Sequence, residues 1–127
     1  MRAALLAVTL ALPLAATLPV THAQAQKAGV YDVTGTGSDG TPYTGQLMLS
    51  QVGLSSWQVQ WLIGPTRMIG VGMTSGNTFA VTFDVGNSTG MSIYNVAPDG
   101  SMTGQWTMIG GNGIGTETAV PQQAAKP

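Results

Sequence analysis

The sequence predicts an all-β protein: a single small antiparallel eight-stranded up-and-down β-barrel that follows a cleaved signal peptide. The clearest observation is the alternating pattern of residues 57–63. Large apolar side chains occupy every odd position, and Gln58 and Gln60 lie between them. Successive side chains of a strand point to opposite faces, so this pattern indicates a strand with one buried face. Trp57 and Trp61 on that face need a larger interior than one hairpin can provide.

Regularly spaced turn signals are the second observation. Segments rich in Gly, Asn and Asp lie at residues 37–40, 52–55, 64–66, 75–77, 86–89, 98–100 and 110–113, and such residues supply the positive φ angles of tight hairpins. They separate eight runs that start near residues 30, 41, 56, 67, 78, 90, 101 and 114. This spacing is typical of an antiparallel meander. Closing the meander into a barrel leaves no open edge, and an open sandwich is the alternative.

The alternation also predicts which side chains point inward. The predicted core consists of Tyr31, Val33, Tyr43, Leu47, Leu49, Trp57, Val59, Trp61, Ile63, Phe79, Val81, Phe83, Ile93, Met102, Trp106 and Met108. Most of these are large, so we expect them nearly to fill an eight-stranded barrel. The outer face is then expected to carry mainly Gln, Thr and Ser, with little apolar area.

The first 25 residues are predicted to be a signal peptide. A short positive start at Arg2 precedes an apolar run, and Ala23-Gln24-Ala25 has the small-x-small pattern of a cleavage site. A transmembrane anchor is disfavoured because prolines interrupt the run. The predicted organisation is a signal peptide at 1–25, a short tail at 26–29, the barrel at 30–120 and a flexible tail at 121–127. We expect export to the periplasm or outside of a Gram-negative bacterium.

Composition disfavours several classes of function. After residue 25, three basic residues face five acidic ones, so the chain lacks the basic stripe of a nucleic-acid-binding protein. The strands are short and their inward positions bulky, so we expect no membrane insertion after cleavage of the signal peptide. The sequence contains no Cys, and its one His lies within the signal peptide. We therefore expect no enzyme activity, no catalytic residues, no metal site and no cofactor.

Three motifs resemble functional sites and have simpler explanations. The Gly spacing in residues 35–40 matches a dinucleotide fingerprint, but a strand follows it where that fingerprint requires a helix. The six methionines after residue 25 are scattered, which favours flexible core packing over copper binding. A glycosidase pair among Asp32, Asp84 and Glu117 has no support from spacing.

Five residues are candidates for ligand binding. Trp57, Trp61 and Trp106 would line the interior and contact a ring-shaped ligand. Arg67 and Glu117 are the charged candidates, because Arg67 is the only cation outside the two tails and Glu117 is the only glutamate. They could anchor a ligand at one mouth of the barrel, or form a structural salt bridge at the rim.

The two halves of the chain share a short pattern. Asp39-Gly40 is followed by residues 44–46, Thr-Gly-Gln, and Asp99-Gly100 is followed by the same three residues at 103–105. Either an internal repeat or two hairpins with the same turn chemistry explains this pattern. Gly45 and Gly104 fall at inward positions, where a glycine lets a bulky ring or another backbone come close.

A series of short motifs resembles a known family. In order, they are Tyr31-Asp32-Val33-Thr34-Gly35, Asp39-Gly40-x-x-Tyr43-x-Gly45, Trp61-x-Ile63-Gly64, Gly70-x-Gly72, Tyr94, Asp99-Gly100-x-x-x-Gly104-x-Trp106 and Gly115-Thr116-Glu117-Thr118. Together they are similar to small exported proteobacterial proteins often labelled fibronectin-binding proteins. This resemblance implies adhesion through a protein or glycan partner at the surface, without implying particular binding residues. The meander also resembles avidin- and lipocalin-type barrels, although the opening Gly-x-Trp-x-Asn of avidins is absent.

Two hypotheses of function follow. The first is an exported, non-enzymatic surface-interaction or adhesion-type module that uses the outer face or the hairpin tips. The alternative is a carrier that holds a small apolar or aromatic ligand inside the barrel. A filled interior favours the first hypothesis, and a hollow one favours the second.

Overall fold

The structure is a computed structural model that describes residues 11, 13 and 26–123. The predicted signal peptide lies outside the described residues apart from those two isolated positions. Within the described part of the chain, no helix is long and apolar enough to cross a membrane.

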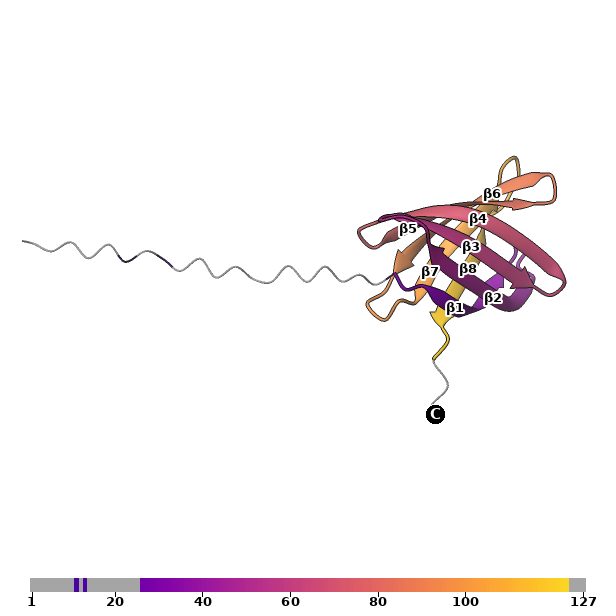
Figure 1. Cartoon of the computed structure of the whole chain (residues 1–127). Helices are drawn as coiled ribbons and strands as arrows, with labels where there is room; N and C mark the ends of the chain where they lie inside the picture. The colour runs from indigo at the N-terminus through magenta and orange to yellow at the C-terminus, as the bar shows by residue number, and fades with distance from the viewer. Residues whose placement is uncertain (1–10, 12, 14–25, 124–127) are drawn as a thin grey trace, which may run out of the picture.

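In the part of the chain that the structure describes, eight antiparallel strands wind around one axis and close into a barrel in the order β1 to β8 (Figure 1). They are β1 Gly29–Thr36, β2 Pro42–Gln51, β3 Ser56–Ile63, β4 Thr66–Ser75, β5 Thr78–Val85, β6 Ser88–Val96, β7 Met102–Met108 and β8 Gly115–Pro121. Each strand starts within two residues of its predicted position. The eight-stranded up-and-down barrel is therefore confirmed, and the open sandwich is wrong.

Pairing of the first and last strands closes the barrel. Val33 of β1 lies opposite Gly45 of β2 on one side and Ala119 of β8 on the other. Strand β1 thus has a hydrogen-bonded neighbour along both edges, as does every other strand. Closure removes the unpaired strand edges through which open sheets associate.

The meander gives the barrel two different ends. The hairpins that join β1 to β2, β3 to β4, β5 to β6 and β7 to β8 lie at one end, which we call the mouth. The other three connections, the start of β1 and the end of β8 lie at the opposite end, which we call the base. Side chains pack the base tightly, and its buried residues are Tyr31, Leu49, Trp57, Phe79, Val96, Met102 and Ala119.

The predicted core is correct in its pattern, with one error of facing. Ile93 points outward and is 56 % exposed, whereas its neighbour Tyr94 is 2 % exposed. Strand β6 directs Gly90, Ser92 and Tyr94 inward. The small inward residues at the start of β6 hide the alternation, because the larger apolar side chains of Met91 and Ile93 occupy its outer face.

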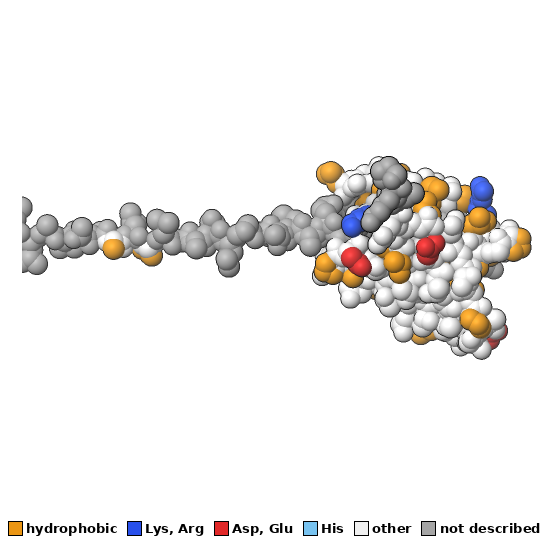
Figure 2. All heavy atoms as spheres, turned by 90° about the horizontal axis from the view of Figure 1, so that it is seen from below, with side chains coloured by type: hydrophobic (Ala, Val, Ile, Leu, Met, Phe, Trp, Pro, Cys, Tyr) orange, Lys and Arg blue, Asp and Glu red, His pale blue; other side chains and the backbone are white. Residues whose placement is uncertain are grey.

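The outer wall is more apolar than the sequence pattern predicts. Uncharged polar groups and backbone cover most of the face in Figure 2, with separate hydrophobic patches and few charged side chains. Large exposed apolar side chains occur on β2, β3, β4 and β6, namely Met48, Leu62, Ile69, Val71, Met73, Met91 and Ile93. The expectation of an outer face with little apolar area is therefore wrong.

The repeated Asp-Gly pattern marks two similar turns. The carboxylates of Asp39 and Asp99 accept hydrogen bonds from the backbone N–H groups of Thr41 at 2.9 Å and Ser101 at 2.8 Å. These bonds lower the pKa of both aspartates. One turn joins β1 to β2 at the mouth, and the other joins β6 to β7 at the base. A duplicated four-stranded half would place both at the same end, so shared turn chemistry explains the pattern.

We predict that Phe79→Ala strongly destabilises the barrel. Phe79 is fully buried and its ring stacks on Tyr94 with centroids 6.1 Å apart. Removing a buried phenyl ring costs about 3–5 kcal/mol, a large part of the roughly 5–10 kcal/mol expected for a domain of this size. Thr82→Ala, on the outer face of the same strand, should be nearly neutral. Urea midpoints measure both effects, and equal midpoints would contradict the assigned facing.

Candidate ligand-binding cavity

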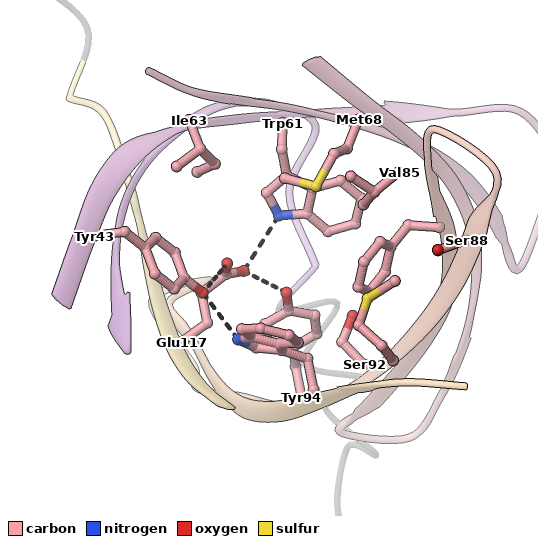
Figure 3. Close-up of a pocket in the computed structure, with 12 residues that line it drawn as sticks. Tyr43, Trp61, Ile63, Met68, Val85, Ser88, Ser92, Tyr94 and Glu117 are labelled. Atoms are coloured by element: carbon pink, nitrogen blue, oxygen red, sulfur yellow. Dashed lines mark hydrogen bonds between the residues drawn. The ribbon is translucent and has the colours of Figure 1, made fainter. Parts of the chain in front are cut away.

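A cavity of about 430 Å³ occupies the mouth half of the barrel (Figure 3). Several of its lining side chains are only half-buried, so it is open to solvent at the mouth. The lining residues are Tyr43, Trp61, Ile63, Met68, Phe83, Val85, Ser88, Ser92, Tyr94, Trp106, Met108 and Glu117. The prediction of a nearly filled interior is correct for the base and wrong for the mouth.

Glycines on the inner wall explain how large rings line this cavity without filling it. Inward-facing Gly115 lies beside the indole of Trp106, and a Cβ there would overlap the ring. Gly90 provides the same space for the ring of Phe83. A glycine lets a ring lie close to the backbone of a neighbouring strand. The rings therefore cover the wall and leave the centre open.

Glu117 is the polar centre of the cavity and is only 6 % exposed. Its Oε1 accepts a hydrogen bond from the Tyr43 hydroxyl at 2.9 Å. Its Oε2 accepts one from Trp61 Nε1 at 3.2 Å and a second from the Tyr94 hydroxyl. Figure 3 shows these donors converging on the carboxylate from different walls. The network joins β8 to β2, β3 and β6 across the interior.

Two indole groups fix the direction of the hydrogen bonds, because an indole N–H can only donate. Trp106 Nε1 donates to the Tyr43 oxygen at 3.0 Å, so the Tyr43 proton is free to point at Glu117. Trp61 donates to Glu117 directly. The carboxylate is thus surrounded by donors, the arrangement that suits its ionised form.

Burial of Glu117 opposes this stabilisation of its ionised form. Desolvation raises the pKa of Glu117 from its ordinary value of 4.5, and the bonds from Tyr94, Tyr43 and Trp61 only partly offset it. Burial and the nearby carboxylate also raise the pKa values of Tyr43 and Tyr94. Both phenols therefore keep their protons at neutral pH and remain donors.

The structure brings together three of the five predicted site residues. Trp61, Trp106 and Glu117 line the cavity and belong to one hydrogen-bonded network. Trp57 lies in the base, where its Nε1 donates to Thr74 Oγ1 at 3.4 Å, and it does not line this cavity. Position along β3 separates Trp57 from Trp61, although both face inward.

Arg67 lies on the outer side of the wall. It is exposed on β4 and opposite Leu62 of β3, another outward-facing residue. The predicted rim pair with Glu117 does not form, because Glu117 points into the barrel. Donation from neutral hydroxyl and indole groups replaces the expected ion pair. Among the residues described, no group of three or more His, Cys, Asp or Glu side chains could hold a metal ion.

Three important cavity residues were not among the predicted site residues. Tyr43 and Tyr94 donate to Glu117, and Ser92 places a buried hydroxyl that has no hydrogen-bond partner among the described residues. The available signal was the inward alternation of Ser92 and Tyr94 on β6. Because Ile93 was predicted to face inward, its neighbours Ser92 and Tyr94 were expected to face outward.

Comparison with known proteins shows the fold. No protein-family model and no curated protein sequence matches the chain. A redesigned β-barrel, b11L5F_LGL, is 20 % identical with a TM-score of 0.68, over 80 % of this chain and 96 % of its own. The redesigned barrel mFAP1, bound to DFHBI, is 18 % identical with a TM-score of 0.65, over 80 % and 98 %.

A third solved structure has the same architecture. This fluorescence-activating β-barrel, designed de novo, is 15 % identical with a TM-score of 0.61, over 80 % of this chain and 98 % of its own. At these identities the likeness shows the fold alone. The predicted barrel is thus supported by known structures, and these comparisons give no support to the resemblance to fibronectin-binding proteins.

We predict that Glu117 makes the barrel less stable as the pH rises. Its raised pKa means that, between 4.5 and the folded-state value, the folded chain binds more protons than the unfolded chain. Stability therefore falls as the pH rises through this window. Glu117→Gln cannot ionise, so it should lack this component of the pH dependence. Urea midpoints measured across the window test this, and parallel curves for the two proteins would contradict it.

Proposed function

We propose that this protein binds a small, mainly apolar ring compound in the mouth half of its barrel. The observation that carries this proposal is the open cavity of about 430 Å³, which is lined mostly by aromatic and aliphatic side chains and contains a few convergent polar groups. Small-molecule sites typically have this composition and size. The tightly packed base supports the walls of this cavity.

The structural neighbours agree with this proposal. mFAP1, a barrel of the same fold, is bound to DFHBI in its solved structure. The fold can therefore support small-molecule binding, and the cavity described here supplies the space for it in this chain. The ligand-carrier hypothesis thus has more support than the adhesion hypothesis.

Two further expectations complete the proposal. Binding without catalysis is proposed because the chain after residue 25 offers no Cys or His. Export to the periplasm or beyond is proposed from the signal-peptide pattern of residues 1–25. A carrier that works there would take up its ligand outside the cytoplasm.

We predict saturable binding of N-phenyl-1-naphthylamine, a neutral dye whose emission rises in apolar surroundings. Ser92→Phe should abolish the rise, because the new ring would point into the cavity. Asn95→Phe is the matched control: it adds a ring on the outer face of the same strand, outside the outer groove, and should bind the dye like the wild type. Equal affinity in Ser92→Phe and the wild type would show that the dye binds elsewhere. Circular dichroism checks that both variants are folded.

A surface-interaction or adhesion-type role is the second candidate. The observation that favours it is the exposed apolar side chains on the outer wall of β4 and β6, including Val71 and Met91. A groove also crosses the outside of β5, β6 and β7, beside Ile93 and Ile114. Apolar patches of this kind are found at protein-binding surfaces. The occupant would be a protein partner, and the resemblance suggests fibronectin.

Surface plasmon resonance against immobilised fibronectin tests this second role. Val71→Lys places a charge in the middle of the apolar outer wall and should weaken such binding at least about tenfold, because an unpaired charge is costly to bury at an interface. Ser92→Phe, which changes the inside, should leave it unchanged. No response from the wild type would remove this candidate and leave the carrier proposal intact.

A further inference from the structure

The polar groups inside the cavity define what kind of ligand fits, and this inference rests on the function proposed above. Among the described residues that line the cavity, Glu117 is the only acid and none is basic. The two described cations, Lys27 and Arg67, are both exposed and belong to the N-terminal tail and the outer wall. A ligand in the cavity therefore meets one carboxylate without a compensating positive charge.

The hydrogen bonds leave room for one more donor. A carboxylate offers about four acceptor positions, two on each oxygen. Both positions on Oε2 are occupied by Trp61 and Tyr94, whereas Oε1 accepts from Tyr43 alone among the described residues. The unused position on Oε1 can accept a hydrogen bond from a ligand. An anion or a hydrogen-bond acceptor of the ligand placed there would face Oε1, which is itself an acceptor, and would be repelled.

Ser92 supplies an independent polar contact. Its Oγ is buried and lines the cavity near the Tyr94 hydroxyl, and it makes no hydrogen bond of 3.5 Å or shorter to a described residue. An unpartnered buried hydroxyl is costly, and a ligand that bonds it recovers that cost. Figure 3 shows Ser92 and Glu117 at different places on the cavity wall, with aromatic rings around them.

We propose that the cavity selects flat ring compounds that carry an amine or another N–H donor directed at Glu117, and that it rejects carboxylates and other anions. The rings of Trp61, Phe83 and Trp106 contact the apolar body of the ligand. The carboxylate of Glu117 accepts the N–H group, and a cationic nitrogen gains further from its negative charge. Ser92 bonds a second polar atom where the ligand has one.

Three naphthalene compounds of similar size test this selectivity by isothermal titration calorimetry at neutral pH. They are 2-naphthylmethylamine, which is cationic, 2-methylnaphthalene, which is neutral, and 2-naphthoate, which is anionic. We expect the amine to bind at least about tenfold more tightly than 2-methylnaphthalene, the size of effect typical of a hydrogen bond to a charged group. Naphthoate should bind most weakly.

Two matched variants locate the effect. Glu117→Gln should remove the advantage of the amine over 2-methylnaphthalene. Asp84→Asn removes one negative charge from the outer wall and should preserve that advantage, because Asp84 is exposed. The amine keeping its full advantage in Glu117→Gln would overturn the inference. If Glu117→Gln fails to fold, the order of the three affinities in the wild type decides the question by itself.

The outcomes separate this inference from the proposed function. Binding of 2-methylnaphthalene without any preference for the amine would overturn the inference and leave the ring-binding function in place. Naphthoate binding as tightly as the amine would also overturn it. Failure of all three compounds to bind would overturn the inference and the proposed function together.

Discussion

A carboxylate buried without a cation beside it is the constraint on which the mouth of this barrel depends. Placing Glu117 inside an apolar wall would be costly unless donors surrounded it. Tyr43, Trp61 and Tyr94 are those donors. Since they come from three other strands, satisfying one charge also fixes the positions of rings that form the cavity. The hydrogen bonds to Glu117 therefore also hold the aromatic wall of the cavity in place.

The base and the mouth use large side chains differently. In the base, rings and aliphatic chains meet across the axis and exclude solvent. In the mouth, rings lie against glycines, as Trp106 does against Gly115, and leave the axis open. Large aromatic side chains can thus either fill or line a barrel, depending on whether the neighbouring strand provides a side chain or a glycine at that position. The base contributes a packed core, and the mouth contributes the open cavity.

Alternation and turn chemistry were enough to predict the strands, their order and most of their facing, because both are local properties of the chain. Whether the interior is hollow depends on contacts between strands, and a list of large side chains does not contain these. Trp61 and Trp106 were predicted as cavity residues from their size. Tyr43 and Tyr94 were not, since their importance comes from Glu117, which is distant in the sequence. Arg67 was wrongly predicted to belong to the site. It was chosen because it is the only cation outside the two tails, which does not determine the face of the strand on which it lies.

The positions of the chain ends relative to the cavity have a practical consequence. Strand β1 starts at Gly29 and β8 ends at Pro121, both at the base, and the cavity opens at the opposite end. A tether or fusion partner joined beside either residue would hold the barrel with its opening directed away from the attachment. An immobilised array of such barrels would therefore present every opening to the solution, which is the orientation that the proposed ligand binding requires.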